Sequence, residues 1–185
     1  MSDKCPLNRK RAAPGKDPKA RTGKRSEYGT QLREKQKIKR MYGMAEKQFH
    51  ITFERALRMP GVTGENLIRL LESRLDNVTY RMHYAINRNQ ARQLVLHGHI
   101  LVNGKKVTIP SYEVKPADVI EVRESSKKLA VVQNGLTEIS KSGTMPWVSV
   151  DVDAVKGTYT QYPQRAEVTD LADIKEQLVV ELYSK

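Results

Sequence analysis

The chain has 185 residues, which is enough for one domain of ordinary size or two small ones. Its formal net charge of +12 indicates a polyanionic partner, and the excess lies at one end: residues 1–58 hold 17 Lys and Arg against 6 Asp and Glu, and residues 59–185 hold 16 against 15. A single cysteine excludes a disulfide framework and a thiolate metal cage, and no apolar run is long enough to span a membrane, so we expect a soluble, cytoplasmic protein.

Residues 1–29 are rich in Pro, Gly, Lys and Arg and contain almost no aliphatic side chains. Such a segment cannot bury enough apolar surface to offset its loss of chain entropy, so we expect an extended basic arm that orders only on a partner. A solubilising tail would have a similar composition, but a tail this long and basic more often binds nucleic acid. Thr30 is a plausible N-cap for a strongly basic helix over residues 31–42, which Gly43 ends.

Two amphipathic helices are predicted next, and they should pack together through their apolar stripes. The first covers residues 44–59 and stops at Pro60 and Gly61, and Thr63 opens the second. The apolar positions at helical spacing are Ala45, Phe49, Phe53, Ala56 and Leu57 in the first helix and Leu67, Leu70, Leu71 and Leu75 in the second. Asp76 can then cap a further helix over residues 77–85, with Val78 and Met82 facing inward.

A helix followed by a hairpin is predicted over residues 87–107. Asn87 and Gln90 have the spacing of a capping box, and Gly98 suits a helix end in left-handed geometry. The Asn103-Gly104 pair between short apolar runs is a strong hairpin signal, because both central residues of such a turn need a positive φ.

The rest of the chain alternates strand and helix patterns. A turn over residues 115–118 leads to a strand at 119–122, and a short helix can follow within residues 125–136. The remaining predicted elements are strands within 147–153 and 157–163 and a final helix over 171–184, in which Ile174, Leu178 and Leu182 align. We therefore expect an α+β protein with a mainly antiparallel sheet and a basic arm.

Signals for metal binding and catalysis are weak. The four histidines, at positions 50, 83, 97 and 99, are not joined by a cluster of cysteines or carboxylates, and a zinc site needs about four well-placed ligands. The chain has no nucleophile elbow, no zinc-protease motif and no Walker loop. The tripeptide Arg74-Leu75-Asp76 is similar to one that holds the catalytic aspartate of pseudouridine synthases. The alternative that we favour is that Asp76 caps a helix and that Arg74 forms an ion pair or binds phosphate.

Several stretches resemble one known family. Residues 74–82 (RLDNVTYRM) and 87–122 (NRNQARQLVLHGHILVNGKKVTIPSYEVKPADVIEV) resemble the small RNA-binding module first described in bacterial small-subunit ribosomal protein number four. Pseudouridine synthases, a tyrosyl-tRNA synthetase and a ribosome-associated heat-shock protein share that module. The flanks YGTQLREKQKIKRMYG, TGENLIRLLESRLDNVTYRM, PWVSVDVDAVKGTYTQYP and EQLVVELYSK look like the ribosomal protein family itself, and the match covers nearly all of residues 26–185.

The resemblance implies an all-α domain with an inserted α/β RNA-binding module. The implied division is an extended arm at 1–29, a helical domain at 30–73 completed by 170–185, the module at 74–140, and strands at 141–169 that complete its sheet and return to the helices. It also implies a structural, non-enzymatic protein, ribosome-bound in the cytoplasm. Such a protein binds the five-helix junction in the 5′ domain of small-subunit (16S) rRNA and nucleates assembly of the subunit body. It contributes to accuracy near the mRNA entrance, beside small-subunit proteins three and five, with no membrane partner.

Many members of the family hold zinc with a run of cysteines near the start, whereas here only Cys5 remains, as in a zinc-free branch. No metal and no cofactor are therefore expected. The module residues that the resemblance assigns to RNA are Arg88, Gln90, Arg92, Gln93, Asn103, Lys105, Lys106 and Tyr112. Those on the arm and the helical domain are Arg25, Tyr28, Arg33, Lys35, Lys37, Lys39, Arg40 and Tyr42.

These contacts should position the RNA backbone rather than read bases, since proteins of this kind recognise the shape of a junction. Rings interleaved with cations also suit stacking on unpaired bases. Contacts from about eight cations to phosphates would give a log–log salt slope on the order of −6 to −7. Two other functions were weighed. An RNA-modifying enzyme would need a catalytic domain after the module, for which residues 141–185 are too few, and a free-standing rescue or heat-shock factor would lack the QLREKQKIKRMYG block and the VVELYSK end.

Overall fold

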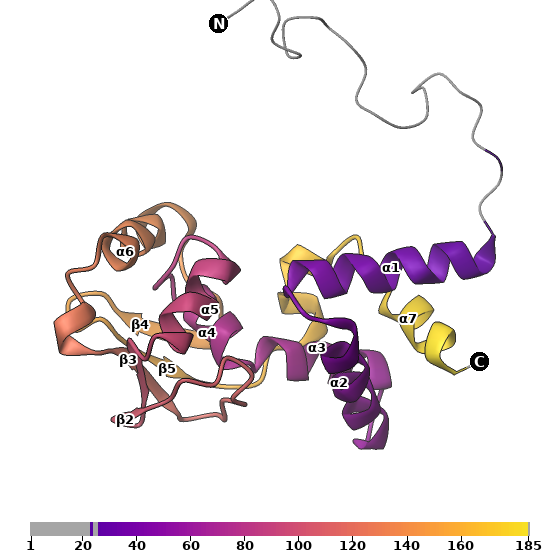
Figure 1. Cartoon of the computed structure of the whole chain (residues 1–185), viewed down its shortest axis with the longest axis horizontal. Coiled ribbons are helices and arrows are strands. Elements are labelled where there is room, and N and C mark those ends of the chain that lie inside the picture. Colours follow the sequence, from indigo (N-terminus) through magenta and orange to yellow (C-terminus); the bar gives the residue numbers. More distant parts are fainter. Residues whose placement is uncertain (1–22, 24–25, 185) are drawn as a thin grey trace, which may run out of the picture.

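The computed structural model describes residues 23 and 26–184 of the chain, and this part has the expected α+β composition (Figure 1). The α-helices are α1 (Glu27–Met41), α2 (Glu46–Arg58), α3 (Thr63–Glu72), α4 (Leu75–Arg81), α5 (Arg88–Leu96), α6 (Ala130–Ser142) and α7 (Glu176–Tyr183). The strands are β1 (Ile100–Val102), β2 (Lys105–Lys106), β3 (Val119–Val122), β4 (Val148–Asp151) and β5 (Lys156–Tyr159). Short 3-10 turns occupy Glu124–Ser126, Arg165–Glu167 and Thr169–Leu171.

Helix α1 begins earlier than the sequence pattern predicted. Its N-cap is Ser26, whose hydroxyl accepts a hydrogen bond from the Gly29 N–H at 3.1 Å, so the prediction of a cap at Thr30 was wrong. Residues 27–29, assigned to the extended arm, are the first turn of this helix. Ser-x-x-Gly satisfies a free N–H just as well as the later threonine would, and Glu27 places a negative charge at the positive end of the helix dipole. The other residues of the predicted arm, 1–22 and 24–25, lie outside the described residues.

Helices α2 and α3 pack against each other as predicted, and the leucine stripe of the second is fully buried. Phe49, Phe53 and Ala56 face inward from α2. Two positions of the predicted stripe were wrong, because Ala45 is exposed and Leu57 is 57% exposed. Ala45 is the extended N-cap residue before the helix, and Leu57 lies in its last turn.

Helix α7 returns from the far end of the chain to the first helices and packs against α1 and α3 (Figure 1). It is shorter than predicted, because Arg165 donates to the carbonyls of Leu171 and Ile174 at 2.8 and 3.0 Å and so engages acceptors that a helix would use. The predicted apolar stripe is therefore wrong in part. Ile174 is buried but precedes the helix, and the buried residue of α7 is Val179.

The five strands form one antiparallel sheet in the order β2-β1-β3-β5-β4. The hairpin prediction is confirmed, since Asn103 and Gly104 have φ values of 51° and 74°. Gly98 also has the predicted positive φ, at 73°. Ile100, Val102, Ile120 and Val122 alternate along β1 and β3 and bury one face of the sheet.

Helices α4, α5 and α6 gather beside this sheet (Figure 1). Gly135 lets α6 approach closely, because a Cβ at that position would lie 2.3 Å from the carbonyl oxygen of His83. The N-cap of α4 is Arg74, so the prediction that Asp76 is the cap was wrong. Asp76 instead forms an ion pair with Arg74 at 2.7 Å and accepts from the Asn77 N–H at 2.9 Å, which agrees with the ion-pairing alternative. No helix in the described part is long and apolar enough to cross a lipid bilayer.

Glu46 ties the first helix to the last. Its carboxylate accepts from the Lys35 ammonium, from Lys39 Nζ at 2.9 Å and from the Tyr183 hydroxyl at 3.1 Å. The hydrogen bond from Lys35, with those from Lys39 and Tyr183, outweighs partial burial and lowers the pKa of Glu46 from 4.5 to about 2. Glu46 therefore links α1, α2 and α7 through one charged group.

This pKa predicts acid sensitivity. A carboxyl with a folded pKa below its unfolded pKa stabilises the fold above the unfolded pKa and loses that contribution as the pH falls towards the folded pKa. The free energy of unfolding should therefore fall from about pH 5 to about pH 2, and Glu46→Gln should make that fall shallower in urea titrations. Glu54, which has the same 48% side-chain exposure and is paired with His50, is the matched control. Equal acid dependence of Glu46→Gln and Glu54→Gln would contradict the assignment.

Candidate nucleic-acid interface

The basic residues of α1 divide between an exposed face and a buried face. Arg33, Lys37 and Arg40 are exposed and lie at i, i+4 and i+7, so they share one face of the helix. Lys37 also pairs with Glu34 on this surface. Tyr28 is 59% exposed one turn earlier. These four side chains are placed where an extended polyanion could reach them.

Three other α1 candidates serve the fold. Lys35 is buried and paired with Glu46, and Lys39 is bonded to the same carboxylate, with 20% of its side chain exposed. Tyr42 is only 4% exposed, and its hydroxyl donates to Glu72 at 2.6 Å. Lys35 and Tyr42 are thus buried and engaged within the protein, and their contacts with RNA stay untested predictions. The helical periodicity could have revealed this, since both positions fall on the side of Ile38. Arg25 lies outside the described residues.

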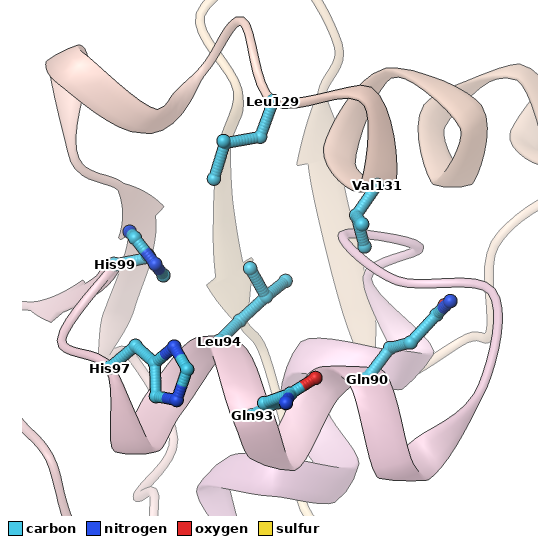
Figure 2. Close-up of a pocket in the computed structure, with 7 residues that line it drawn as sticks. All are labelled: Gln90, Gln93, Leu94, His97, His99, Leu129 and Val131. Carbon is cyan, nitrogen blue, oxygen red and sulfur yellow. The ribbon is translucent and has the colours of Figure 1, made fainter.

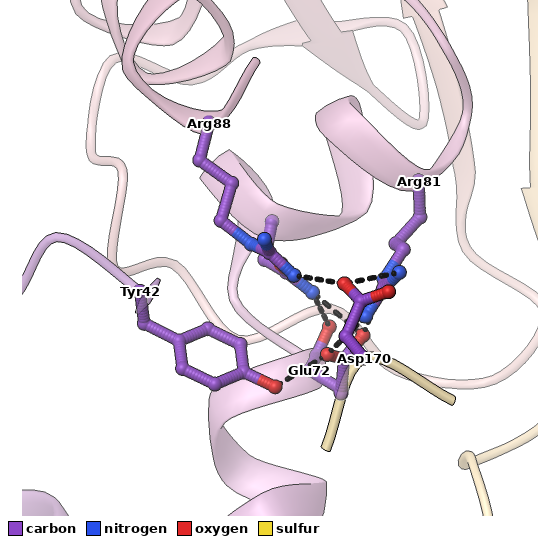
Figure 3. Close-up of polar contacts among 6 residues, drawn as sticks. Tyr42, Glu72, Arg81, Arg88 and Asp170 are labelled. Carbon is purple, nitrogen blue, oxygen red and sulfur yellow. Dashed lines mark hydrogen bonds and ion pairs between the residues drawn. The ribbon is translucent and has the colours of Figure 1, made fainter. Parts of the chain in front are cut away.

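A buried carboxylate, Glu72, organises the junction between α3 and α4 (Figure 3). It is fully buried and accepts two hydrogen bonds from Arg81, at 2.8 and 2.9 Å, as well as those from Tyr42 and from Asn77 Nδ2 at 2.7 Å. Burial, together with the adjacent Glu72 charge, raises the pKa of Tyr42 well above its usual value. The charge of Glu72 is thus compensated by one guanidinium and two neutral donors.

Asp170 connects this centre to the return segment before α7. It lies 3.1 Å from an Arg81 nitrogen and 2.9 Å from an Arg88 nitrogen (Figure 3). Burial alone would raise the pKa of Asp170, but the two guanidinium groups outweigh it and lower the pKa. Burial likewise opposes the charge of Arg81, and the hydrogen bonds to Glu72 with the charge of Asp170 raise its pKa.

Arg88 belongs to this network as well as to the predicted interface. Its side chain is 18% exposed, bonds Asn77 Oδ1 at 2.9 Å and lies over the Tyr80 ring at 4.6 Å. Its guanidinium is thereby held between α4, α5 and the Asp170 segment. Its donors are directed to protein acceptors in the chain alone, and its contact with RNA stays a prediction.

The module also presents exposed cations. Arg92 has 44% of its side chain exposed and lies 3.6 Å from Asp76, while Lys105 and Lys106 are exposed on the hairpin. Gln93 is exposed beside Arg92, and Tyr112 is 37% exposed. Asn103 instead shapes the turn: it donates to Asp118 at 2.8 Å and accepts from the Val119 N–H at 2.9 Å. Gln90 lines a pocket beside α5.

Arg92 also lines a cleft of about 250 Å³ between the α1–α2 turn and the module. Gln48 and Ala45 border it on the α2 side, and Arg74, Pro110 and Ser111 on the module side. Residues far apart in sequence meet here, so the reading of the sequence missed Gln48 and Ser111 as neighbours of Arg92. Residues of α2 and residues of the module therefore both line the cleft.

The described part of the chain offers no site for metal binding, and Asp76 is not placed as a free catalytic carboxylate. Within residues 26–184, His, Cys, Asp and Glu form no group of three or more that could hold a metal ion. Asp76, the carboxylate of the Arg-Leu-Asp tripeptide, is 6% exposed and engaged by Arg74 and the Asn77 N–H. It occupies a structural ion pair.

Known protein families match both parts of the chain. Residues 1–72 match the ribosomal protein S4/S9 N-terminal domain, and residues 73–120 match the S4 domain. The chain is 52% identical to small ribosomal subunit protein uS4 of Thermotoga maritima and 50% identical to that of Thermodesulfovibrio yellowstonii. It is also 52% identical to that of Syntrophotalea carbinolica, and each alignment covers 100% of this chain and 87% of the relative. The chain belongs to the ribosomal protein uS4 family. This bears out the resemblance read from the sequence.

The Glu72 network predicts a large loss of stability in one variant. Glu72→Gln leaves Arg81 buried without its bidentate carboxylate, and breaking a buried pair in this way costs about 3–5 kcal/mol. Urea unfolding monitored by circular dichroism measures the loss. The matched control is Glu113→Gln, which removes the exposed pair with Arg55 and should cost less than about 1 kcal/mol. Similar losses in the two variants would contradict the structural role given to Glu72.

Proposed function

We propose that the chain binds the five-helix junction in the 5′ domain of small-subunit rRNA and nucleates assembly of the subunit body. Membership of the uS4 family supports part of this proposal, because uS4 proteins are structural, ribosome-bound, rRNA-binding proteins and not enzymes. The observation that carries the proposal of binding to the five-helix junction is the distribution of exposed cations. Arg33, Lys37 and Arg40 share one face of α1, and Arg92, Lys105 and Lys106 are exposed on the module.

The proposed binding mode is contact with phosphates from two rigid bodies at a fixed separation. A folded RNA junction places phosphates of several helices at set distances, and a protein can recognise that shape without reading bases. The Glu72 network supports this mode because it links α3, α4, α5 and the segment before α7 through buried ion pairs. Rigid separation of the two cation groups then contributes to specificity.

We propose the same domain division as the one that the resemblance implies, with the first boundary moved to residue 26. The helical domain then comprises residues 26–73 and 170–185, the module residues 74–140, and residues 141–169 complete its sheet and return. Support comes from the pairing of β5 with β3 and from the packing of α7 on α1. The two matched family models also meet between residues 72 and 73.

The neighbours on the subunit are part of the proposal. The family resemblance supports contacts with small-subunit proteins five and three, a position near the mRNA entrance, an effect on translational accuracy and a cytoplasmic location. Two exposed apolar residues are available for protein contacts: Leu57, in the last turn of α2, is 57% exposed, and Val62, the N-cap of α3, is 60% exposed. They lie apart from the cation face of α1.

The deciding experiment is a filter-binding titration of the full chain against the 5′ domain of small-subunit rRNA. We expect that RNA to bind more tightly than an unrelated structured RNA of equal length at moderate salt. Equal affinity for both RNAs would overturn the proposal, because phosphate attraction alone does not distinguish them.

Salt dependence tests the number of phosphate contacts. The six exposed cations of the proposed interface in the described part of the chain predict a log–log slope of roughly −4 to −5. A steeper slope, on the order of −6 to −7, requires about eight contacts. Binding constants measured across a series of KCl concentrations give the slope. A slope near zero would exclude an interface built on these cations.

A double substitution tests the module. Arg92→Ala with Lys105→Ala should weaken rRNA binding several-fold and leave thermal stability nearly unchanged, because both side chains are exposed and contribute little to packing. Filter binding and thermal melting measure the two effects. Arg58→Ala with Lys156→Ala removes the same charge from outside the interface and should bind nearly as the wild type does. A large loss of stability with unchanged binding would show that the first pair is a folding element.

A further inference from the structure

A pocket of about 230 Å³ lies between α5 and the start of α6 (Figure 2). The proposed contacts between exposed cations and phosphates do not involve the residues that line it. Its volume is smaller than the roughly 300–1,000 Å³ of pockets that hold drug-sized ligands. A single flat group of one or two rings is therefore the appropriate size of occupant.

Apolar side chains form two sides of the pocket. Leu94 points up from α5 in the middle of the pocket, and Leu129 points towards it from the segment before α6 (Figure 2). Val131 closes one side. Leu129 is 38% exposed although it is a large aliphatic residue. A flat group between Leu94 and Leu129 would gain apolar contact on both faces.

Polar groups line the α5 edge of the pocket, and one of them lacks a partner. Gln90 Oε1 is buried and accepts no hydrogen bond. The Asn87 side chain accepts from the Gln90 N–H at 2.9 Å, so the first bond of the predicted capping box is present and the reciprocal bond is not. A buried acceptor without a partner destabilises the fold. Gln90 and Gln93 thus bring two side-chain amides to this edge of the pocket, where they can form hydrogen bonds with the edge of a bound ring.

Two imidazole rings form the opposite end. The rings of His97 and His99 lie 6.1 Å apart, and His99 Nδ1 is held by the Ser126 hydroxyl at 2.8 Å. Burial, followed by the charges of His97, Arg123 and Lys106, lowers the pKa of His99. His99 is thus a neutral, fixed ring at neutral pH, suited to contact with another ring system.

Cations stand close to this end of the pocket. Lys106 packs over Gly98, where an added Cβ would lie 2.1 Å from the lysine Cε, so its stem follows the turn between His97 and His99. The Arg123 N–H donates to the His99 carbonyl at 2.8 Å, and its side chain is exposed. The pocket therefore combines a flat apolar slot, amide groups at one edge and positive charge at its mouth.

We propose that this pocket binds one unstacked nucleobase of an RNA chain whose neighbouring phosphates contact Lys106 and Arg123. Apolar or aromatic contact on the ring faces, with amide hydrogen bonds to the ring edge, is how proteins hold bases splayed out of single-stranded RNA. The inference rests on the proposed RNA binding and adds to it a contact with a base. An apolar peptide side chain would leave the amides of Gln90 and Gln93 without a ligand partner, so the base is the better match.

Ring signals provide the direct test. The full chain is titrated with a single-stranded oligouridylate, with the oligoadenylate of equal length, and with the abasic sugar-phosphate oligomer of that length. We expect the NMR signals of the His97 and His99 rings and of the Leu129 methyl groups to shift with at least one base-containing oligomer and not with the abasic one. Equal shifts with the abasic oligomer would overturn the proposal, because the sugar-phosphate backbone alone would then account for the shifts.

Two variants test the pocket in the rRNA complex. Val131→Phe should fill it and weaken binding to the 5′-domain rRNA by roughly five- to tenfold, the size of one lost base contact, with an unchanged salt slope. Gln90→Leu should weaken binding similarly and raise the melting temperature, since it removes the unpartnered acceptor. If Gln90 had a purely structural role, Gln90→Leu would not lower the rRNA affinity while raising the melting temperature.

The control is Gln177→Leu, the same change at an exposed helical position on α7. Failure of the wild-type chain to prefer the 5′-domain RNA would refute the proposed function. Preference by the wild type, with Val131→Phe and Gln90→Leu binding as Gln177→Leu does, would refute the pocket alone.

Discussion

A single buried charge, Glu72, sets the arrangement of the molecule. A carboxylate without solvent is tolerated only when its lone pairs are engaged, and here Arg81, Tyr42 and Asn77 engage them. The donors come from two places, since Tyr42 follows α1 whereas Asn77 and Arg81 belong to α4, and the acceptor Glu72 ends α3. The requirement to satisfy one charge therefore fixes how the first helices meet the sheet-containing half.

The same requirement decides which basic residues remain available to a partner. Arg81 and Arg88 are held by Glu72 and Asp170, and Lys35 is held by Glu46, so these three cations form ion pairs within the protein. Arg92, one turn beyond Arg88 on α5, has only a 3.6 Å contact with Asp76 and stays half-exposed. Residues of the same type four positions apart thus have different roles, one holding the scaffold and the other facing outward.

Local patterns predicted the elements better than they predicted the roles. The Asn103-Gly104 turn, the left-handed Gly98 and the leucine stripe of α3 follow from backbone and hydrophobic periodicity, which are properties of neighbouring residues. The burial of Tyr42 depends on Glu72, and the restraint of Arg88 depends on Asp170, 82 residues away. No local pattern contains those partners. The sequence likewise showed half of the Asn87 and Gln90 capping box, but the free Gln90 oxygen depends on how α6 approaches α5.

The packing of α7 on α1 has a consequence for the order in which the protein folds during its synthesis. All five strands and α4 to α6 lie within residues 75–159, so the sheet and its helices can form as soon as that segment leaves the ribosome that is making it. Helix α1 must wait for residues 176–183, because α7, against which it packs, is translated long after it. Until then the side of this strongly basic helix that α7 covers is exposed, and an early element of the fold is completed only after the sheet can form.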